Sequence, residues 1–148
     1  MNGLIIRFVC YGIFGWCVEV IWTAVTRKIS GVARDWRLQG FTCLWMFPIY
    51  GLAVLLYEPL HNAVQARAWP LRALLYAMGI MSVEYATGRA LRRLTGACPW
   101  DYSQRARWHI HGLVRLEYAP AWAALGLLME RLHDFLVRLT PCIRRALS

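Results

Sequence analysis

The sequence predicts an all-α fold: a polytopic membrane helix bundle of about four transmembrane helices with an amphipathic C-terminal extension. Of the 148 residues, 59% are hydrophobic, whereas a soluble domain has roughly 45–50%. Four apolar segments each approach the roughly 20 residues that a helix needs to cross a bilayer. Eight tryptophans and seven tyrosines suit two interfacial belts. We therefore expect a single transmembrane domain over residues 1–148, in the cell inner (plasma) membrane as a multi-pass protein.

The four expected spans follow one another along the chain, and the last leads into the extension. They cover Leu4–Val25, Phe41–Tyr57, Leu71–Leu91 and Leu113–Met129, the last with a continuation to Leu139. The first is longer than the apolar region of a signal peptide, so we expect it to remain as a helix. Pro48 and Pro120 predict a kink or local unwinding in the second and fourth. Apolar residues at helical spacing in the C-terminal tail predict an interfacial helix.

The charge pattern favours a membrane lipid as partner and argues against nucleic acid. The net charge of +9 comes from arginine, because Lys28 is the single lysine. The basic residues lie mostly between and after the apolar segments, as in positive-inside anchoring. The loops at 26–40 and 89–111 are rich in arginine, whereas 58–70 contains only Arg67. We therefore expect the two basic loops to be cytoplasmic and both termini to be outside, although four arginines in the tail argue the other way.

Two carboxylates inside apolar segments, Glu19 and Glu84, indicate where to look for function. A charged group facing lipid costs several kcal/mol, roughly 2.5–3.5 on insertion scales, so such groups usually face protein or a wet cavity. If four helices cross, both carboxylates lie in the half of the bilayer that faces the basic loops. Gly12 and Gly15 share a helical face with Glu19, which predicts close helix contact there.

We expect one polar pocket, open to the cytoplasmic face, that binds the substrate. Its predicted lining residues are Glu19, Arg37, Tyr50, Glu84, Trp100, Asp101 and Arg115. At least one carboxylate should contact Arg37 or Arg115, because arginine binds carboxylates with a planar fork. Other interpretations remain open. The carboxylates could be protonated and fix only helix packing, Arg37 could be an interfacial anchor, and Asp101 could cap a short turn.

Five short motifs in this order resemble a known family. They are GWCVE at 15–19, Arg37 with Gly40 and Phe41, PIYG at 48–51, EY at 84–85 followed by Gly88, and WDYS at 100–103. Together they resemble a small family of bacterial membrane proteins named putative ABC-transporter type IV, over about residues 8–128. The chain departs from the family pattern at Leu44 and Trp45, where the family has a Gly-Pro pair, and at Pro99, where it often has tryptophan.

The resemblance implies a transporter or permease-like membrane component that binds a small or lipid-like substrate. The chain lacks the GxxxxGK[ST] phosphate loop, so ATP-driven transport would need a separate ATPase subunit. One alternative is a membrane-embedded enzyme that uses Glu19, Glu84 and Asp101 on a lipid-linked substrate. Another is a structural subunit of a membrane complex. A homo-oligomer would add packing surface to so small a unit.

Metal and cofactor sites are not expected from the sequence. His109 and His111 form an HxH pair without an evident third ligand, and metal sites need three or four. The five cysteines form no CxxC pair, which argues against a zinc ribbon or a disulfide framework. Motifs typical of hydrolases and metalloproteases are absent from the sequence. We therefore predict no catalytic residues and no cofactor, and favour a protein that is not an enzyme.

Overall fold

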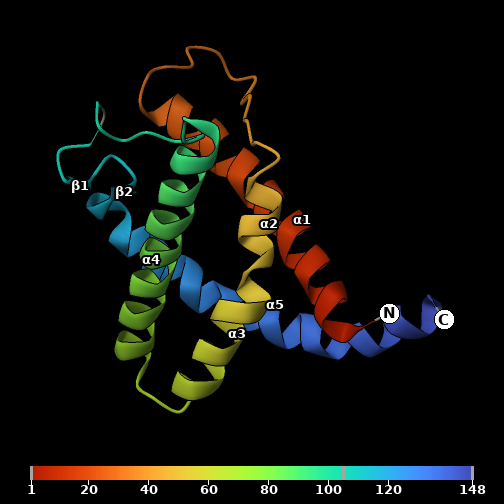
Figure 1. Cartoon of the computed structure of the whole chain (residues 1–148). Coiled ribbons are helices and arrows are strands. Elements are labelled where there is room, and N and C mark those ends of the chain that lie inside the picture. The colour runs from red at the N-terminus through yellow and green to blue at the C-terminus, as the bar shows by residue number, and fades with distance from the viewer. Residues whose placement is uncertain (1, 105, 148) are drawn as a thin grey trace. The chain divides into compact units, whose positions relative to one another are not determined.

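The computed structural model describes residues 2–104 and 106–147 and is all-α apart from one short hairpin (Figure 1). In order, the elements are α1 (Gly3–Ile29), α2 (Met46–Gly51), α3 (Ala53–Val64), α4 (Trp69–Thr95), β1 (His109–Ile110), β2 (Val114–Arg115), the 3-10 helix η1 (Leu116–Tyr118) and α5 (Ala119–Ala146). β1 and β2 pair antiparallel, with His109 opposite Arg115. The chain forms two compact units, Met1–Leu55 with Leu136–Ser148, and Leu56–Phe135.

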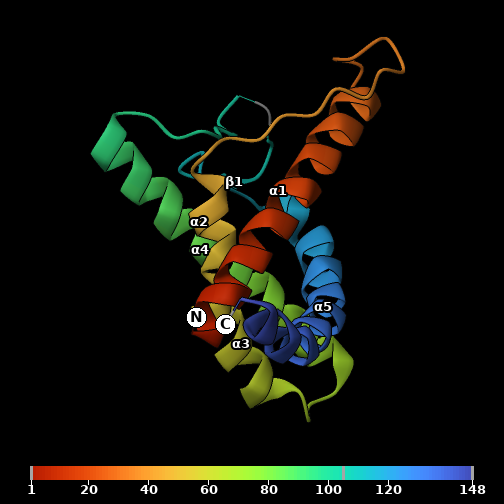
Figure 2. The ribbon, with the colours of Figure 1, turned by 90° about the vertical axis from the view of Figure 1, so that its right-hand side faces the viewer.

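The first unit is organised around α1 and α2, which lie side by side (Figure 2). The side chain of Asn2 accepts a hydrogen bond from the backbone N–H of Leu4 and so caps the start of α1. Two glycines of α1 allow the close approach of α2. A Cβ added at Gly12 would meet the Phe47 ring at 2.7 Å, and one added at Gly15 would overlap the Tyr50 ring. The predicted close helix contact on this face is confirmed.

The second unit has its core where α3, α4 and the first part of α5 meet. Tyr57 of α3 and Tyr76 of α4 are buried. The Tyr57 hydroxyl donates to the backbone carbonyl of Gly126 on α5 at 2.8 Å, and a Cβ at Gly126 would meet the Tyr76 side chain. Gly126 therefore lets α5 pack closely against the Tyr76 ring of α4, and the Tyr57 hydroxyl provides a hydrogen-bond partner for the Gly126 carbonyl.

The second apolar segment differs from the prediction. Its helix begins at Met46 and not at Phe41, because side chains of α1 hold the residues before it by hydrogen bonds. The Thr23 hydroxyl bonds to both the N–H and the carbonyl of Phe41. Pro48 does not kink the helix, since it lies in the first turn, where its missing N–H would have no intrahelical partner. The break falls instead at Leu52, between α2 and α3.

The fourth predicted span was wrong at its start. Residues 114–118 form β2 and η1, and the helix begins only at Ala119, because the hairpin pairs Val114 with Ile110. Pro120 then lies in the first turn of α5 and is tolerated there. The helix continues through Pro141 to Ala146. The tail is therefore helical, as predicted, and its location at a membrane interface stays a prediction.

α1 is long and apolar enough to cross a membrane, with a mean hydropathy of 1.9 over its most apolar part. Within the described ranges it is the one helix that meets the criteria of both length and composition. The predictions for α1 and α4 were close in extent, Leu4–Val25 against Gly3–Ile29 and Leu71–Leu91 against Trp69–Thr95. The all-α class is confirmed, whereas the arrangement of four crossings is not.

Candidate functional site

The first unit joins two of the predicted site residues directly. The Tyr50 hydroxyl on α2 donates a hydrogen bond of 2.5 Å to Oε2 of Glu19 on α1. Gly15, one turn before Glu19, provides the space that the Tyr50 ring occupies. The neighbouring Trp16 donates from Nε1 to the carbonyl of Cys43 at 3.0 Å, which holds the chain leading into α2. The GWCVE and PIYG motifs thus meet in space as a carboxylate–tyrosine pair.

Arg37 lies in the exposed loop of the first unit and pairs with Asp35. Its Nε and Nη2 atoms lie 2.9 and 2.7 Å from Oδ2 of Asp35. The hydrogen bond from the Arg37 side chain is the main reason that the pKa of Asp35 is lowered below its usual value. Arg37 is thus tied to its own loop, and its predicted part in substrate binding stays a prediction.

The second unit contains a second carboxylate–tyrosine pair. The Tyr102 hydroxyl donates to Oε1 of Glu84 on α4 at 2.9 Å. Trp100 donates from Nε1 to the carbonyl of Leu113 at 3.0 Å, which fixes the WDYS segment against the hairpin. Asp101 Oδ1 accepts from the backbone N–H of Ser103 at 2.9 Å. That backbone hydrogen bond is the largest cause of the lowered pKa of Asp101, and the turn that it makes fits the capping interpretation of this residue.

Arg115 lies on β2, where it interacts with its sequence neighbours. Its Nε lies 2.5 Å from Oε2 of Glu117, and its guanidinium lies 4.7 Å from the centre of the Tyr118 ring. The carboxylate contacts of these two predicted site residues are therefore local, to Asp35 for Arg37 and to Glu117 for Arg115.

The seven predicted site residues divide between the two units. Glu19, Arg37 and Tyr50 belong to the first, whereas Glu84, Trp100, Asp101 and Arg115 belong to the second. In each unit one helix carboxylate binds a tyrosine of a later motif. A pocket shared by all seven stays a prediction.

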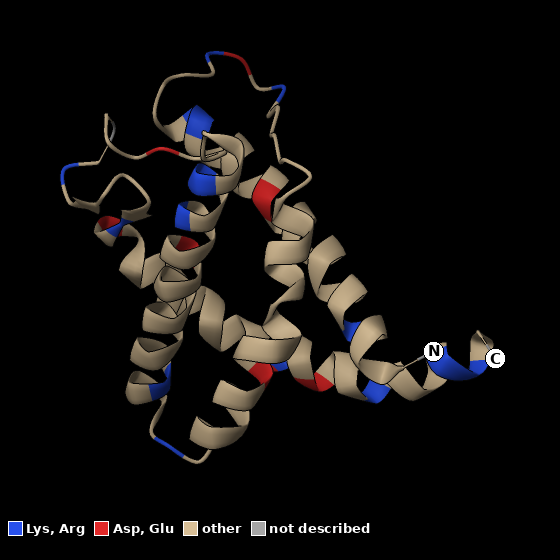
Figure 3. Ribbon diagram, in the orientation of Figure 1, with Lys and Arg blue, Asp and Glu red and all other residues tan. Residues whose placement is uncertain are grey.

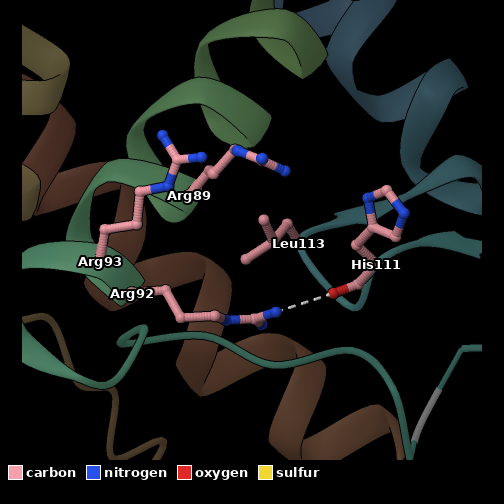
Figure 4. A pocket seen from close by; sticks show the side chains of 5 residues that line it. All are labelled: Arg89, Arg92, Arg93, His111 and Leu113. Atoms are coloured by element: carbon pink, nitrogen blue, oxygen red, sulfur yellow. Dashed lines mark hydrogen bonds between the residues drawn. The ribbon is translucent and has the colours of Figure 1, made fainter.

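A cavity of about 320 Å³ opens at the C-terminal end of α4 (Figure 4). It is lined by Arg89, Arg92, Arg93, His111 and Leu113. Arg92 Nη1 donates to the carbonyl of His111 at 3.1 Å, and Arg89 Nη1 lies 3.3 Å from the Tyr85 hydroxyl. The sequence analysis used these arginines only to orient the chain. Their spacing of three and four residues places them on one helical face, and this was the signal that could have found the site.

A buried polar network in the second unit was also missed. The Tyr76 hydroxyl donates to Oε1 of Glu130 at 2.9 Å and lies 2.9 Å from Nδ1 of His61. Arg72 binds both oxygens of Glu130, from Nε at 2.8 Å and Nη2 at 3.1 Å. Oε1 of Glu58 lies 3.6 Å from Nδ1 of His133. The sequence signal was a glutamate with a histidine three residues later, once on α3 and once on α5.

The fold and these contacts first define a class: a small all-α protein with a long apolar N-terminal helix and carboxylates bonded within its helix packing. A family model described as putative ABC-transporter type IV matches residues 6–146. The chain therefore belongs to this family, and the resemblance noted from its motifs is confirmed. No solved structure matches the chain. The family name relates the chain to ABC transporters and to a membrane location, and names no substrate.

Proposed function

We propose that this chain is a multi-pass inner-membrane component of a transporter, and that it binds a small or lipid-like substrate through an anionic group. The observation that carries the proposal is the arginine-lined cavity at the end of α4. The polar site lies in the half of the bilayer that faces the two basic loops, which are cytoplasmic in the proposed orientation.

The surface of the helices supports a lipid environment. Large apolar side chains are more than half exposed on α1, α3, α4 and α5, namely Ile5, Ile13, Ile21, Leu55, Leu74, Met78, Leu128 and Phe135. In water, an extended apolar surface promotes association of protein molecules, whereas in a bilayer the same surface contacts the lipid acyl chains. On α1 and α4 the basic residues lie near the helix ends (Figure 3). This distribution favours a crossing by α4 as well as by α1.

The chemistry of the cavity favours an anion. Three arginines line it. Arg89 and Arg92 contact neutral oxygens, from Tyr85 and His111, and Arg92 also interacts electrostatically with the Asp101 carboxylate. Arginine binds phosphate and carboxylate in a bidentate manner. A volume of about 320 Å³ is at the lower end of the size of small-molecule sites. A phosphate or carboxylate head group would fit both the charge and the volume.

The two carboxylate–tyrosine pairs would hold the rest of the site in shape. Glu19 with Tyr50 fixes α2 on α1, and Glu84 with Tyr102 fixes the WDYS segment on α4. Within the second unit, Glu84 and Tyr102 with Trp100, Asp101 and Arg115 form the polar surroundings of the proposed site. Glu19, Arg37 and Tyr50 are proposed separately as substrate-binding residues of the first unit. A separate ATPase subunit would supply the energy, because the chain lacks a phosphate-binding loop. Pairing of two copies of the chain is part of the same proposal.

Binding to defined lipids tests the anion site. The purified chain in nanodiscs would be titrated with phosphatidylglycerol, phosphatidylcholine and inorganic phosphate, with native mass spectrometry as the readout. We expect preference for the anionic ligands and a loss of about tenfold or more in Arg92→Ala combined with Arg93→Ala, since a charge-assisted bond contributes about 1.5–3 kcal/mol. The exposed Arg138 on α5 provides the matched control, because Arg138→Ala removes a charge that is not among the residues lining the cavity.

Each result of this titration decides a part of the proposal. Binding of phosphatidylglycerol alone identifies a lipid head group, and binding of free phosphate identifies a soluble anion. The site would be refuted if the wild type bound all three ligands with the same affinity and the double variant bound them as tightly as the wild type. Transport itself is tested by cross-linking in membranes: an ATPase that carries the GxxxxGK[ST] motif should be captured by the wild-type chain, and its absence would contradict the transporter assignment.

A further inference from the structure

A second cluster in the Leu56–Phe135 unit carries metal-binding chemistry. His61 of α3 with His133 and Asp134 of α5 each place one ligand atom within 4.8 Å of the others. The two histidines are buried, at 6% and 7% exposure, and Asp134 reaches the surface. We propose that these three residues bind a divalent first-row transition-metal ion, with zinc as the first candidate. This inference is independent of the anion site at the other end of α4.

The geometry of the cluster is near that of a metal site. The imidazole rings of His61 and His133 lie 5.0 Å apart between centroids and are inclined by 61°. Ligands at about 2.0–2.1 Å from zinc in a tetrahedron lie roughly 3.4 Å from one another. The three ligand atoms, within 4.8 Å of one another, need to close by little more than about 1 Å.

The contacts of the ring nitrogens orient both histidines for metal binding. The Tyr76 hydroxyl donates its single proton to Glu130, so toward Nδ1 of His61, at 2.9 Å, the same oxygen acts as acceptor. Nδ1 of His61 then carries the proton, and Nε2 presents its lone pair. Nδ1 of His133 faces the Glu58 carboxylate at 3.6 Å. Metal-binding histidines usually hold their other ring nitrogen on an oxygen in this way, which fixes the ring and raises its basicity.

The local charge also favours a divalent cation. Three carboxylates, those of Glu58, Glu130 and Asp134, stand around the histidines, and one guanidinium, that of Arg72, pairs with Glu130. Three negative charges and one positive charge leave a formal charge of −2 among these side chains. A divalent ion neutralises it. Protonation of both histidines would do so as well, and the experiment below separates the two.

The type of ligand limits the choice of ion. Two imidazoles and one carboxylate suit zinc, cobalt, nickel, copper or iron, whereas magnesium and calcium prefer sites made of oxygen. Three protein ligands leave one position of a tetrahedron for water, as in zinc sites that exchange a ligand. We therefore assign the site to a borderline transition ion and not to a hard cation.

Metal content after loading with zinc tests the assignment. The chain would be purified with a tag that contains no histidine, incubated with zinc sulfate, desalted and measured by plasma mass spectrometry. We expect about one zinc per chain. Asp134→Ala should weaken binding by about tenfold or more, because a ligand is lost, and Glu58→Gln should weaken it by roughly tenfold. His109→Gln is the matched control, since it removes an exposed histidine of the hairpin that is neither a proposed zinc ligand nor part of the cavity lining.

Two results of the zinc measurement would overturn the proposal. One is a wild-type chain that retains no zinc, as expected if the histidines are protonated partners of Glu58 and Glu130. The other is equal zinc affinity in the wild type and in Asp134→Ala. A substitution of a histidine ligand, such as His133→Gln, would disturb the buried network. The histidine ligands are therefore tested in the wild type, by loading it with cobalt. Visible d–d bands typical of four or five ligands support the site, and a spectrum of the hexaaquo ion refutes it.

Discussion

The pair of Arg72 and Glu130 should make a large contribution to the stability of the α4–α5 contact. The Glu130 carboxylate accepts two hydrogen bonds from Arg72, at 2.8 and 3.1 Å, and one from Tyr76 at 2.9 Å. The side chains of Arg72 and Glu130 are 22% and 18% exposed, so water screens them only in part. The appropriate test is a double-mutant cycle with Arg72→Met and Glu130→Leu.

The expected cost of each single substitution is about 3 kcal/mol. Breaking a buried ion pair costs about 3–5 kcal/mol, because one charge is left without its partner, and the partial exposure favours the lower end. Replacing both residues by apolar ones of similar size should cost only about 1 kcal/mol, since no lone charge remains. The Tyr76 hydroxyl keeps its contact with His61 at 2.9 Å in the double variant. The double variant should therefore be more stable than either single variant.

The Tm of the wild type and of each variant is measured by thermal unfolding in one detergent. A thiol-reactive dye reports the exposure of the five cysteines. For a chain of this size each kcal/mol corresponds to roughly 2–4 °C in Tm, so the single variants should unfold about 6–12 °C below the wild type. A chelator is present throughout, so that bound metal does not contribute. A double variant whose loss equals the sum of the two single losses would show that these side chains do not interact and would refute the reasoning.

Three further outcomes follow from the described contacts. Gly15→Ala should cost about 1–3 kcal/mol because its Cβ overlaps the Tyr50 ring, and unchanged Tm would contradict this packing. The hydrogen bond from Ser103 lowers the folded-state pKa of Asp101. The ionised Asp101 carboxylate therefore stabilises the fold above its unfolded pKa of about 3.9. This stabilisation is lost as pH falls through the lower folded-state pKa. The NMR chemical shift of the Ser103 amide should change with pH in this range, and this change should be absent in Asp101→Asn. Single cysteines at Ser30 and Ser103, in a chain without its native cysteines, should react only from the cytoplasmic side, and labelling of intact cells from outside would reverse the orientation.

The sequence determined the helical class and the limits of two helices. The predominantly apolar character of the 22 residues Leu4–Val25, in which Arg7 and Glu19 are the charged residues, favours a helix, because a helix satisfies its own backbone hydrogen bonds. α1 and α4 begin and end close to the predicted limits. The order of the five motifs also determined the family, which the match over residues 6–146 confirms. These are properties of local composition and spacing, and they need no knowledge of distant contacts.

The tertiary structure decided which residues meet. Glu19 binds Tyr50 and Glu84 binds Tyr102, partners separated by 31 and 18 residues, and no periodicity in the sequence encodes such pairs. The start of α5 at Ala119 was likewise decided by the pairing of β2 with β1, which withdraws residues 113–115 from the helix. The network of His61, Tyr76 and Glu130 arises only because glycine at position 126 lets α5 approach the Tyr76 ring. Buried polar groups require partners, and the packing of helices that are distant in sequence determines which partners are within reach.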